Sequence, residues 1–250
     1  MLTDTHCHIH EAHFYETDRE AVYDRAIENN VKMICIGTDE TFSRQAVEFA
    51  KTHRDTWATV GVHPHDVKNG WSDIGRLLAE KPDKVIGVGE IGLDYFYENS
   101  PRDLQIKALE EQLQLATDYN LPVSFHVRDA FADFWPVFAN FKGLRGVLHS
   151  FTDNMSNLEK GLSEGLYVGV NGISTFTKDE KQQKMFDSIP VTHMLLETDA
   201  PFLTPTPHRG KVNEPAFVRH VAEYHASRRK VELEHLARVT TANASSLFSI

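Results

Sequence analysis

Cysteines, long apolar runs and low-complexity tracts are scarce or missing in this 250-residue sequence. The two cysteines, Cys7 and Cys35, each stand in an apolar stretch that predicts a strand, so we expect buried free thiols rather than a disulfide framework. No apolar run approaches the ~18 residues of a membrane span, and the first residues lack the basic and apolar regions of a signal peptide. We therefore expect a cytoplasmic protein without membrane contact, and we predict no obligate protein partner.

Positive charge is also in short supply. The chain has 26 Lys and Arg residues against 36 Asp and Glu residues, which gives a formal net charge of −10. This charge opposes long-range attraction to a polyanion and argues against a sequence-specific DNA-binding protein. It does not exclude a nuclease, because bound divalent ions reverse the local sign of charge. Any nucleic acid is expected to be held locally, for example at a strand end, with weak salt dependence.

The chain length fits one (β/α)8 barrel, and we predict a single domain over residues 1–250, although length alone also permits two small domains. Short apolar runs alternate with amphipathic stretches in eight βα units, the pattern of a parallel sheet. Strands are predicted near Leu2 to His8, Lys32 to Gly37, Trp57 to Val62, Val85 to Glu90, Pro122 to His126, Gly146 to His149, Leu166 to Val170 and His193 to Thr198.

Helices are predicted after each strand, and a further one over Val231 to Phe248 caps the C-terminus. The clearest runs from Pro101 to Asn120, where Leu104, Leu109 and Leu113 belong to an apolar face. The others cover Arg19 to Asn29, Phe42 to His53, Ser72 to Glu80, Asp129 to Asn140, Met155 to Glu164, Asp179 to Ser188 and Glu214 to Arg228. A doubly wound open sheet has the same alternation of strands and helices, so this alternation alone does not distinguish it from a closed barrel. The placement of the polar residues favours the TIM-type barrel.

Histidines and carboxylates stand at the ends of the predicted strands. They are His6, His8, His63, Glu90, His126, His149 and Asp199. In a TIM-type barrel the carboxyl ends of the strands converge on one rim, where active sites of this fold lie. Residues far apart in the sequence can therefore surround one cavity of metal-binding size.

The pair His6 and His8 is predicted to bind one ion. Residues two apart on a strand point to the same face, whereas Cys7 points to the other face and is expected in the core. Asp199 ends the eighth strand, which returns beside the first, so it can complete this ligand set and can also accept a proton from an activated water. Glu197 lies on the same face, and for this residue a structural role in supporting the loops is at least as compatible with the sequence as a role in the site.

A second set comprises Glu90, His126 and His149. Glu90 ends an apolar run between two glycines that let the backbone approach closely and turn, which favours a bridging ligand over a solvent-exposed carboxylate. Each histidine alone is equally compatible with a buried structural role. Together with Glu90 they form an ordinary set of ligands for zinc, manganese or iron.

Three further residues are candidates for substrate contact: His63, Arg128 and Arg209. They can hold an anionic substrate at the rim. For Arg128, phosphate contact and a structural ion pair are equally compatible with the sequence, and for Arg209 a solvated loop is the default. The remaining histidines, including His10, His65 and His225, are interpreted as surface or structural residues.

Several motifs occur in order along the whole chain: Asp4-Thr5-His6-Cys7-His8, Gly61-Val62-His63-Pro64-His65, Gly89-Glu90-Ile91-Gly92-Leu93-Asp94, His149-Ser150-Phe151 and Glu197-Thr198-Asp199-Ala200-Pro201. On these motifs the chain resembles the TatD-family deoxyribonucleases. One departure is Asp153-Asn154 after Thr152, where many members have glycine.

The resemblance implies an amidohydrolase-type TIM barrel, metal-dependent phosphodiesterase activity on DNA, and two divalent ions. One ion would take His6, His8, Glu90 and Asp199, and the other would share Glu90 and take His126 and His149. Glutamate would replace the carboxylated lysine that bridges the ions in many related hydrolases. Zn, Mn, Mg, Ni and Fe are not distinguished.

The sequence thus predicts a metal-dependent, exonuclease-like deoxyribonuclease. Asp199, Glu90 and His63 are the expected catalytic residues, with DNA or another phosphodiester as the substrate. One alternative is a hydrolase of the same barrel that acts on an ester, lactone, amide or aminoacyl bond. Another is a non-enzymatic interaction protein stabilised by metal.

Overall fold

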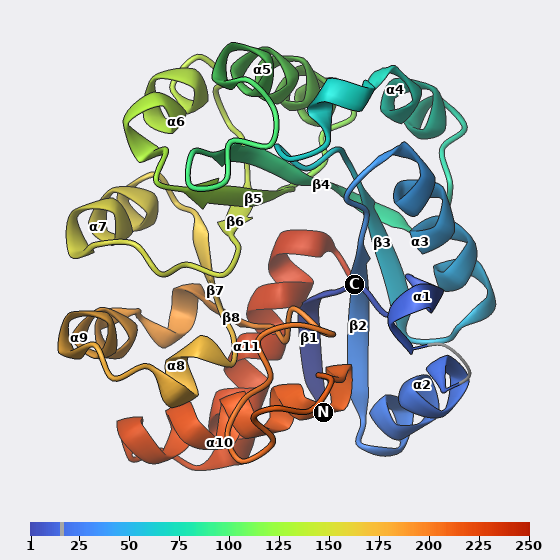
Figure 1. Cartoon of the computed structure of the whole chain (residues 1–250). Helices are drawn as coiled ribbons and strands as arrows, with labels where there is room; N and C mark the ends of the chain where they lie inside the picture. Colours follow the sequence, from blue (N-terminus) through green and yellow to red (C-terminus); the bar gives the residue numbers. More distant parts are fainter. Residues whose placement is uncertain (16–17) are drawn as a thin grey trace. The chain divides into compact units, whose positions relative to one another are not determined.

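The computed structural model describes residues 1–15 and 18–250, in which strands and helices alternate along the chain (Figure 1). The strands form an eight-stranded sheet in chain order, as the predicted βα units require. They are β1 (Leu2–Cys7), β2 (Val31–Ile36), β3 (Thr56–Val60), β4 (Val85–Asp94), β5 (Val123–Arg128), β6 (Gly146–Leu148), β7 (Tyr167–Val170) and β8 (Met194–Leu196).

The helices agree with the predicted ones apart from short elements. They are α1 (Ala12–Tyr15), α2 (Arg19–Glu28), α3 (Glu40–Thr52), α4 (Ser72–Ala79), α5 (Arg102–Asp118), α6 (Phe131–Phe138), α7 (Met155–Ser163), α8 (Ile173–Phe176), α9 (Glu180–Ser188), α10 (Val218–Arg229) and α11 (Leu233–Phe248). The four-residue helices α1 and α8 were not predicted, because they are too short to show a helical period. The helix predicted from Glu214 starts instead with a 3-10 turn, Pro215–Phe217.

The chain divides into two compact units. Unit 1 comprises Met1–Cys35 and Ser150–Ile250, and unit 2 comprises Ile36–His149. The single domain over residues 1–250 stays a prediction. Along the described ranges 1–15 and 18–250, we find no helix with both the length and the apolarity of a membrane span.

In unit 2 the helices α5 and α6 pack on β4 and β5 (Figure 1). Phe125 of β5 meets Phe134 of α6 edge to face, with ring centroids 5.2 Å apart, and both are fully buried. The predicted apolar face of α5 is only part of its buried face, because Gln105 and Gln112 are buried there as well. Buried amides must be hydrogen-bonded, and these two pair with the backbone at the ends of strands.

Gln112 satisfies both backbone groups of one residue beyond β3. Its Oε1 accepts from the Val62 amide at 2.7 Å, and its Nε2 donates to the Val62 carbonyl at 3.2 Å. Gln105 does the same for Asp94 at the end of β4, with distances of 2.8 and 3.1 Å. The two glutamines therefore fix the backbone at the ends of two adjacent strands.

We expect Gln112→Ala to lower the free energy of unfolding by about 1–3 kcal/mol, because it leaves the buried amide and carbonyl of Val62 without partners. Urea unfolding measures this. The matched control is Gln114→Ala on the exposed side of α5, where the glutamine bonds only Asp118, and we expect about 0.5 kcal/mol or less. Equal losses for the two variants would contradict the role assigned to Gln112.

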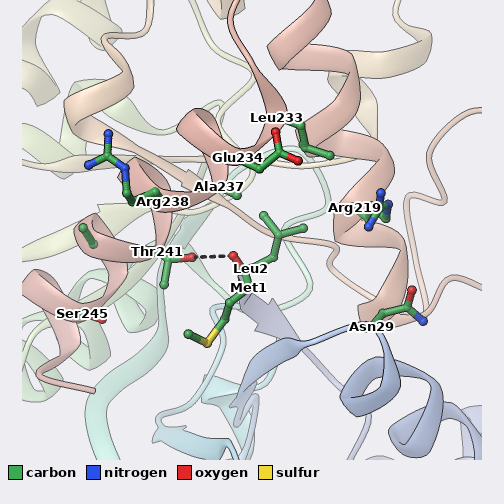
Figure 2. A pocket seen from close by; sticks show the side chains of 11 residues that line it. Met1, Leu2, Asn29, Arg219, Leu233, Glu234, Ala237, Arg238, Thr241 and Ser245 are labelled. Carbon is green, nitrogen blue, oxygen red and sulfur yellow. Dashed lines mark hydrogen bonds between the residues drawn. The ribbon is translucent and has the colours of Figure 1, made fainter.

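In unit 1 the helices α10 and α11 pack on β1 and β8. Cys7 lies in the core, as predicted, and its Sγ donates to the Ile34 carbonyl at 3.5 Å. Cys7 and Cys35 are both buried free thiols, which confirms that prediction. A hollow at the amino end of β1 is lined by Met1, Leu2 and side chains of α10 and α11, among them Arg219 and Arg238 (Figure 2). The histidines of the first motif stand at the other end of β1.

His225 of α10, one of the histidines interpreted as surface or structural residues, is fully buried in unit 1. Its Nε2 lies 2.9 Å from the Ser174 hydroxyl, which itself donates to the Asn171 carbonyl. Burial, and secondarily the charge of Arg229, lowers the pKa of His225 from 6.5 to about 3. The neutral imidazole is therefore the native form.

Because the pKa of His225 is lower in the folded state, the unfolded chain binds more protons between pH 6.5 and about 3. The stabilisation is complete above pH 6.5 and is lost as the pH falls through this window. We expect His225→Gln to flatten the fall in the free energy of unfolding over this range, measured by urea unfolding at several pH values. His235→Gln, at an exposed position of α11, is the control and should keep the wild-type slope.

Candidate metal centre

A bulge in β4 places Glu90. Val88 pairs with Val123 and Ile91 with Phe125, so β4 has one more residue than β5 between these pairs. The prediction that Glu90 ends its strand is wrong, because β4 continues to Asp94. Bulges re-aim side chains, and here the carboxylate of Glu90 faces β5.

The continuation of β4 depends on glycine at position 92. Gly92 has a φ of +154°, and a Cβ there would lie 1.8 Å from the carbonyl oxygen of His126. Gly89, with a φ of +149°, approaches Ser124 of β5 in the same way, with a Cβ distance of 2.8 Å. The two glycines therefore allow the close approach of the backbone that was predicted for them.

Three imidazoles surround one carboxylate oxygen in unit 2. Glu90 Oε1 lies 2.9 Å from His126 Nδ1, 3.7 Å from His63 Nε2 and 3.8 Å from His149 Nε2. Glu90 is only 4% exposed. The structure therefore brings together Glu90, His126 and His149, which the sequence grouped, and adds His63, which the sequence placed on the substrate side.

The donor types and spacing in this cluster fit a divalent ion. Ligand atoms of His63, Glu90 and His126 all lie within 4.8 Å of one another. One carboxylate with several imidazoles is an ordinary set for zinc, manganese or iron. The assignment of each residue as a ligand stays a prediction.

Asp94 supports this cluster, a role that was not predicted from the sequence. Its Oδ2 accepts from His126 Nε2 at 2.8 Å and from His65 Nε2 at 3.0 Å. A histidine with one nitrogen toward the ligand set and the other on a carboxylate has the arrangement common to metal-binding histidines. The even spacing of Glu90 and Asp94 on one strand was the signal that could have identified it. His65, interpreted as surface or structural, also lies beside the cluster.

The two imidazoles nearest Glu90 have pKa values shifted in opposite directions. Burial, and then the neighbouring His126, lowers the pKa of His63. Burial also acts to lower the pKa of His126, but its bonds to Asp94 and Glu90 outweigh this and raise it. A neutral His63 keeps a lone pair for a ligand or a proton, whereas His126 is ordered by two carboxylates.

In unit 1 the carboxyl end of β1 is joined to the segment after β8. The Asp199 amide donates to the His6 carbonyl at 2.9 Å, and the His8 amide donates to the Ala200 carbonyl at 2.8 Å. Asp4, fully buried, accepts from the amide and hydroxyl of Thr198 at 2.8 and 2.5 Å. β8 ends at Leu196, so Asp199 lies beyond the strand rather than at its end as predicted.

These bonds bring three predicted ligands together. Asp199 Oδ1 lies 3.6 Å from His6 Nε2 and 3.4 Å from His8 Nε2. Glu11, which was not predicted as a site residue, is buried and lies 3.4 Å from the other nitrogen of His8. Its spacing of three from His8 across a turn was the available signal.

The other polar candidates have structural contacts. Glu197 Oε1 accepts from the Ser150 amide at 2.7 Å, which supports the loop interpretation. The Arg128 guanidinium stacks 3.9 Å from the Phe96 ring, a contact that neither predicted alternative included. Arg209 stacks 3.7 Å from the Phe176 ring and donates to the Thr204 carbonyl at 2.7 Å.

Comparison with known proteins identifies the family. The model of the TatD-related DNase family matches residues 3–249. The chain belongs to this family. It is 35% identical over 257 residues to the uncharacterized metal-dependent hydrolase YabD of Bacillus subtilis, with full coverage of both chains. It is 38% identical over 251 residues to the 3'-5' ssDNA/RNA exonuclease TatD of Pantoea ananatis, covering 94% of this chain and 95% of that one.

The fold of this TatD-family protein is confirmed by a solved structure. A TatD homologue of Escherichia coli, YJJV, superposes with a TM-score of 0.92 at 28% identity over 100% of this chain and 98% of that one. The predicted TIM-type (β/α)8 fold is therefore correct, as is the prediction of a metal-dependent hydrolase.

We expect Asp94→Asn to weaken binding of the ion at the Glu90 cluster by roughly 10- to 100-fold, because His126 loses the carboxylate that orients it. Titration of apoprotein with Zn²⁺ or Mn²⁺, followed by calorimetry, measures the change. Asp103→Asn, at an exposed position in the first turn of α5, is the control. Unchanged affinity in Asp94→Asn would show that Asp94 has no part in ordering the ligands.

Proposed function

We propose that this TatD-family protein hydrolyses phosphodiester bonds at the end of a single-stranded DNA, using two divalent ions. The observation that carries the proposal is the cluster of three imidazole nitrogens around Glu90 Oε1, at 2.9, 3.7 and 3.8 Å. The name of the Pantoea ananatis relative, a 3'-5' ssDNA/RNA exonuclease, supports the substrate class.

Two ligand sets are proposed. Glu90, His126 and His149 hold one ion, and His6, His8 and Asp199 hold the other, with Glu90 shared between them as the family resemblance implies. The distances within each set support the groups, and a carboxylate has the two oxygens that sharing requires. A divalent ion in such a set makes water more acidic and offsets negative charge on phosphoryl oxygens.

The protein side chains then have separate tasks. Asp199 orients the attacking water and accepts its proton, since its carboxylate is the acceptor beside His6 and His8. His63 holds the phosphate as a neutral imidazole, in keeping with its lowered pKa. His63 is also close enough to Glu90 to serve as a ligand, and ion counts distinguish the two roles. Arg209 is proposed as an outer contact to the substrate.

The net charge of −10 favours a short contact over a long groove for duplex. A strand end presents few phosphates, and these can be neutralised by bound ions alone. The buried free thiols suit a reducing compartment, and we propose that the enzyme acts in the cytoplasm.

The test uses purified protein with labelled single-stranded DNA and Mg²⁺, Mn²⁺ or Zn²⁺, alongside panels of carboxyl esters, lactones, amides and aminoacyl compounds. We expect stepwise shortening of the DNA from one end. Glu90→Gln should lower kcat/KM by roughly 100-fold or more, because the shared ligand is weakened. Metal analysis should find two ions per wild-type chain, and loss of both in Glu90→Gln.

Glu110→Gln, at an exposed position of α5, is the matched control and should keep activity and both ions. Turnover of an ester, lactone, amide or aminoacyl compound without DNA shortening would replace the proposed substrate. No turnover on any panel, with ions bound, would instead favour a metal-stabilised interaction protein. Loss of one ion only in Glu90→Gln would contradict the sharing of Glu90.

A further inference from the structure

Two large aromatic side chains stand exposed directly after β4. Phe96 and Tyr97 are each 55% exposed, although aromatic rings of this size are usually mostly buried. The Arg128 guanidinium lies 3.9 Å from the Phe96 ring and 5.0 Å from the Tyr97 ring. We call Phe96, Tyr97 and Arg128 the aromatic platform.

The platform is held in place by the same carboxylate that orders the metal centre. Asp94 Oδ1 accepts from the amides of Phe96 and Tyr97, both at 3.0 Å, while its Oδ2 binds His126 and His65. The Tyr95 amide donates to the Arg128 carbonyl at 3.0 Å, which ties the turn to β5. The rings are therefore exposed on an ordered turn, and binding to them costs little ordering of the protein.

The platform begins one side chain away from the Glu90 cluster. The Tyr97 ring meets the His65 ring edge to face at 5.4 Å, and the His65 ring meets that of His63 at 4.4 Å. The aromatic platform is therefore an ordered apolar surface beside the groups proposed to hold a phosphate.

The chemistry of the platform suits an unpaired base. The two rings are almost perpendicular, at 87° with centroids 4.8 Å apart, so they form a corner rather than a flat wall. Bases stack on exposed aromatic faces without regard to sequence, and an arginine beside them adds cation–π contact and charge for the backbone. A base paired within a duplex offers no such free face.

We propose that the aromatic platform stacks a nucleobase of the single-stranded substrate next to the metal centre, so that Phe96 and Tyr97 determine affinity for base-bearing single strands. This inference rests on the function proposed above. It gives Arg128 a role in base stacking in addition to charge.

The experiment compares base-bearing and abasic oligonucleotides. Dissociation constants are measured by fluorescence anisotropy with a labelled oligothymidylate that carries phosphorothioate linkages and is therefore cleaved slowly, and with a copy that has abasic residues at its ends. We expect Phe96→Ala/Tyr97→Ala to weaken binding of the base-bearing strand roughly tenfold or more, and the abasic strand by less than about twofold.

Kinetics on cleavable DNA provide a second readout. KM should rise in parallel with the dissociation constant while kcat stays near the wild-type value, because stacking is a binding interaction remote from the bond that breaks. Phe96→Leu, which keeps an apolar side chain without the aromatic face, should lose affinity in the same direction and guards against misfolding of the double variant. Tyr97→Phe should bind as the wild type does.

Trp57→Ala is the matched control, because Trp57 lies beside Lys84 at the opposite end of the strands in the same unit, with 5.2 Å between the ammonium nitrogen and the ring centroid. It should leave binding unchanged.

Equal losses of affinity for base-bearing and abasic strands, or no loss for either, would overturn the proposed role of the aromatic platform. Retained DNA cleavage would then leave the proposed function intact. Wild-type protein that binds strands through Phe96 and Tyr97 but cleaves none would overturn the proposed function alone. If the platform variant lost self-association or a protein partner instead of DNA affinity, the platform would be a protein interface.

Discussion

The close approach of β4 and β5 is the constraint on which the candidate metal centre of unit 2 depends. Gly92 lies against the carbonyl of His126, where any Cβ would overlap the oxygen, and the bulge before it aims Glu90 at the same histidine. The contact of Glu90 Oε1 with His126 Nδ1 thus follows from backbone geometry as much as from side-chain chemistry. Because the rest of β4 continues past the bulge to Asp94, the same approach also positions the carboxylate that binds the far nitrogen of His126.

Buried polar bonds at strand ends are the second recurring device. Gln105 pairs with the backbone at the end of β4, and Gln112 pairs with the backbone just beyond β3. Asp4 pairs with Thr198 beyond β8. Desolvating such groups is costly unless every one is paired, so each pairing specifies one position of the backbone. Burial raises the pKa of Asp4, although its bonds to Thr198 lower it in part. Buried polar groups outside the candidate site therefore fix the backbone positions of the residues proposed as ligands.

The electrostatic interactions at the candidate site come from a few buried groups and not from the net charge of the protein. A chain of net charge −10 gathers several buried imidazoles and carboxylates at a few strand ends, and the Arg128 guanidinium lies over the Phe96 ring. Within one cluster the pKa of His63 is lowered and that of His126 is raised, because His126 bonds to two carboxylates and His63 does not gain enough from them to offset its burial. Coulomb interactions are strongest in such desolvated places, so a small number of groups outweighs the distant surface charge.

The sequence alone determined the βα rhythm, the barrel class and the polar residues near strand ends, because hydrophobic period and motif order are local properties of the chain. It did not show Asp94 or Glu11 as partners of the histidines proposed as ligands, nor the buried face of α5 that carries Gln105 and Gln112. It also placed Glu90 at a strand end and left the surroundings of Arg128 open. Those features depend on which backbone segments meet, and only the tertiary structure decides that, since a one-residue bulge changes the face to which the following side chains of a strand point.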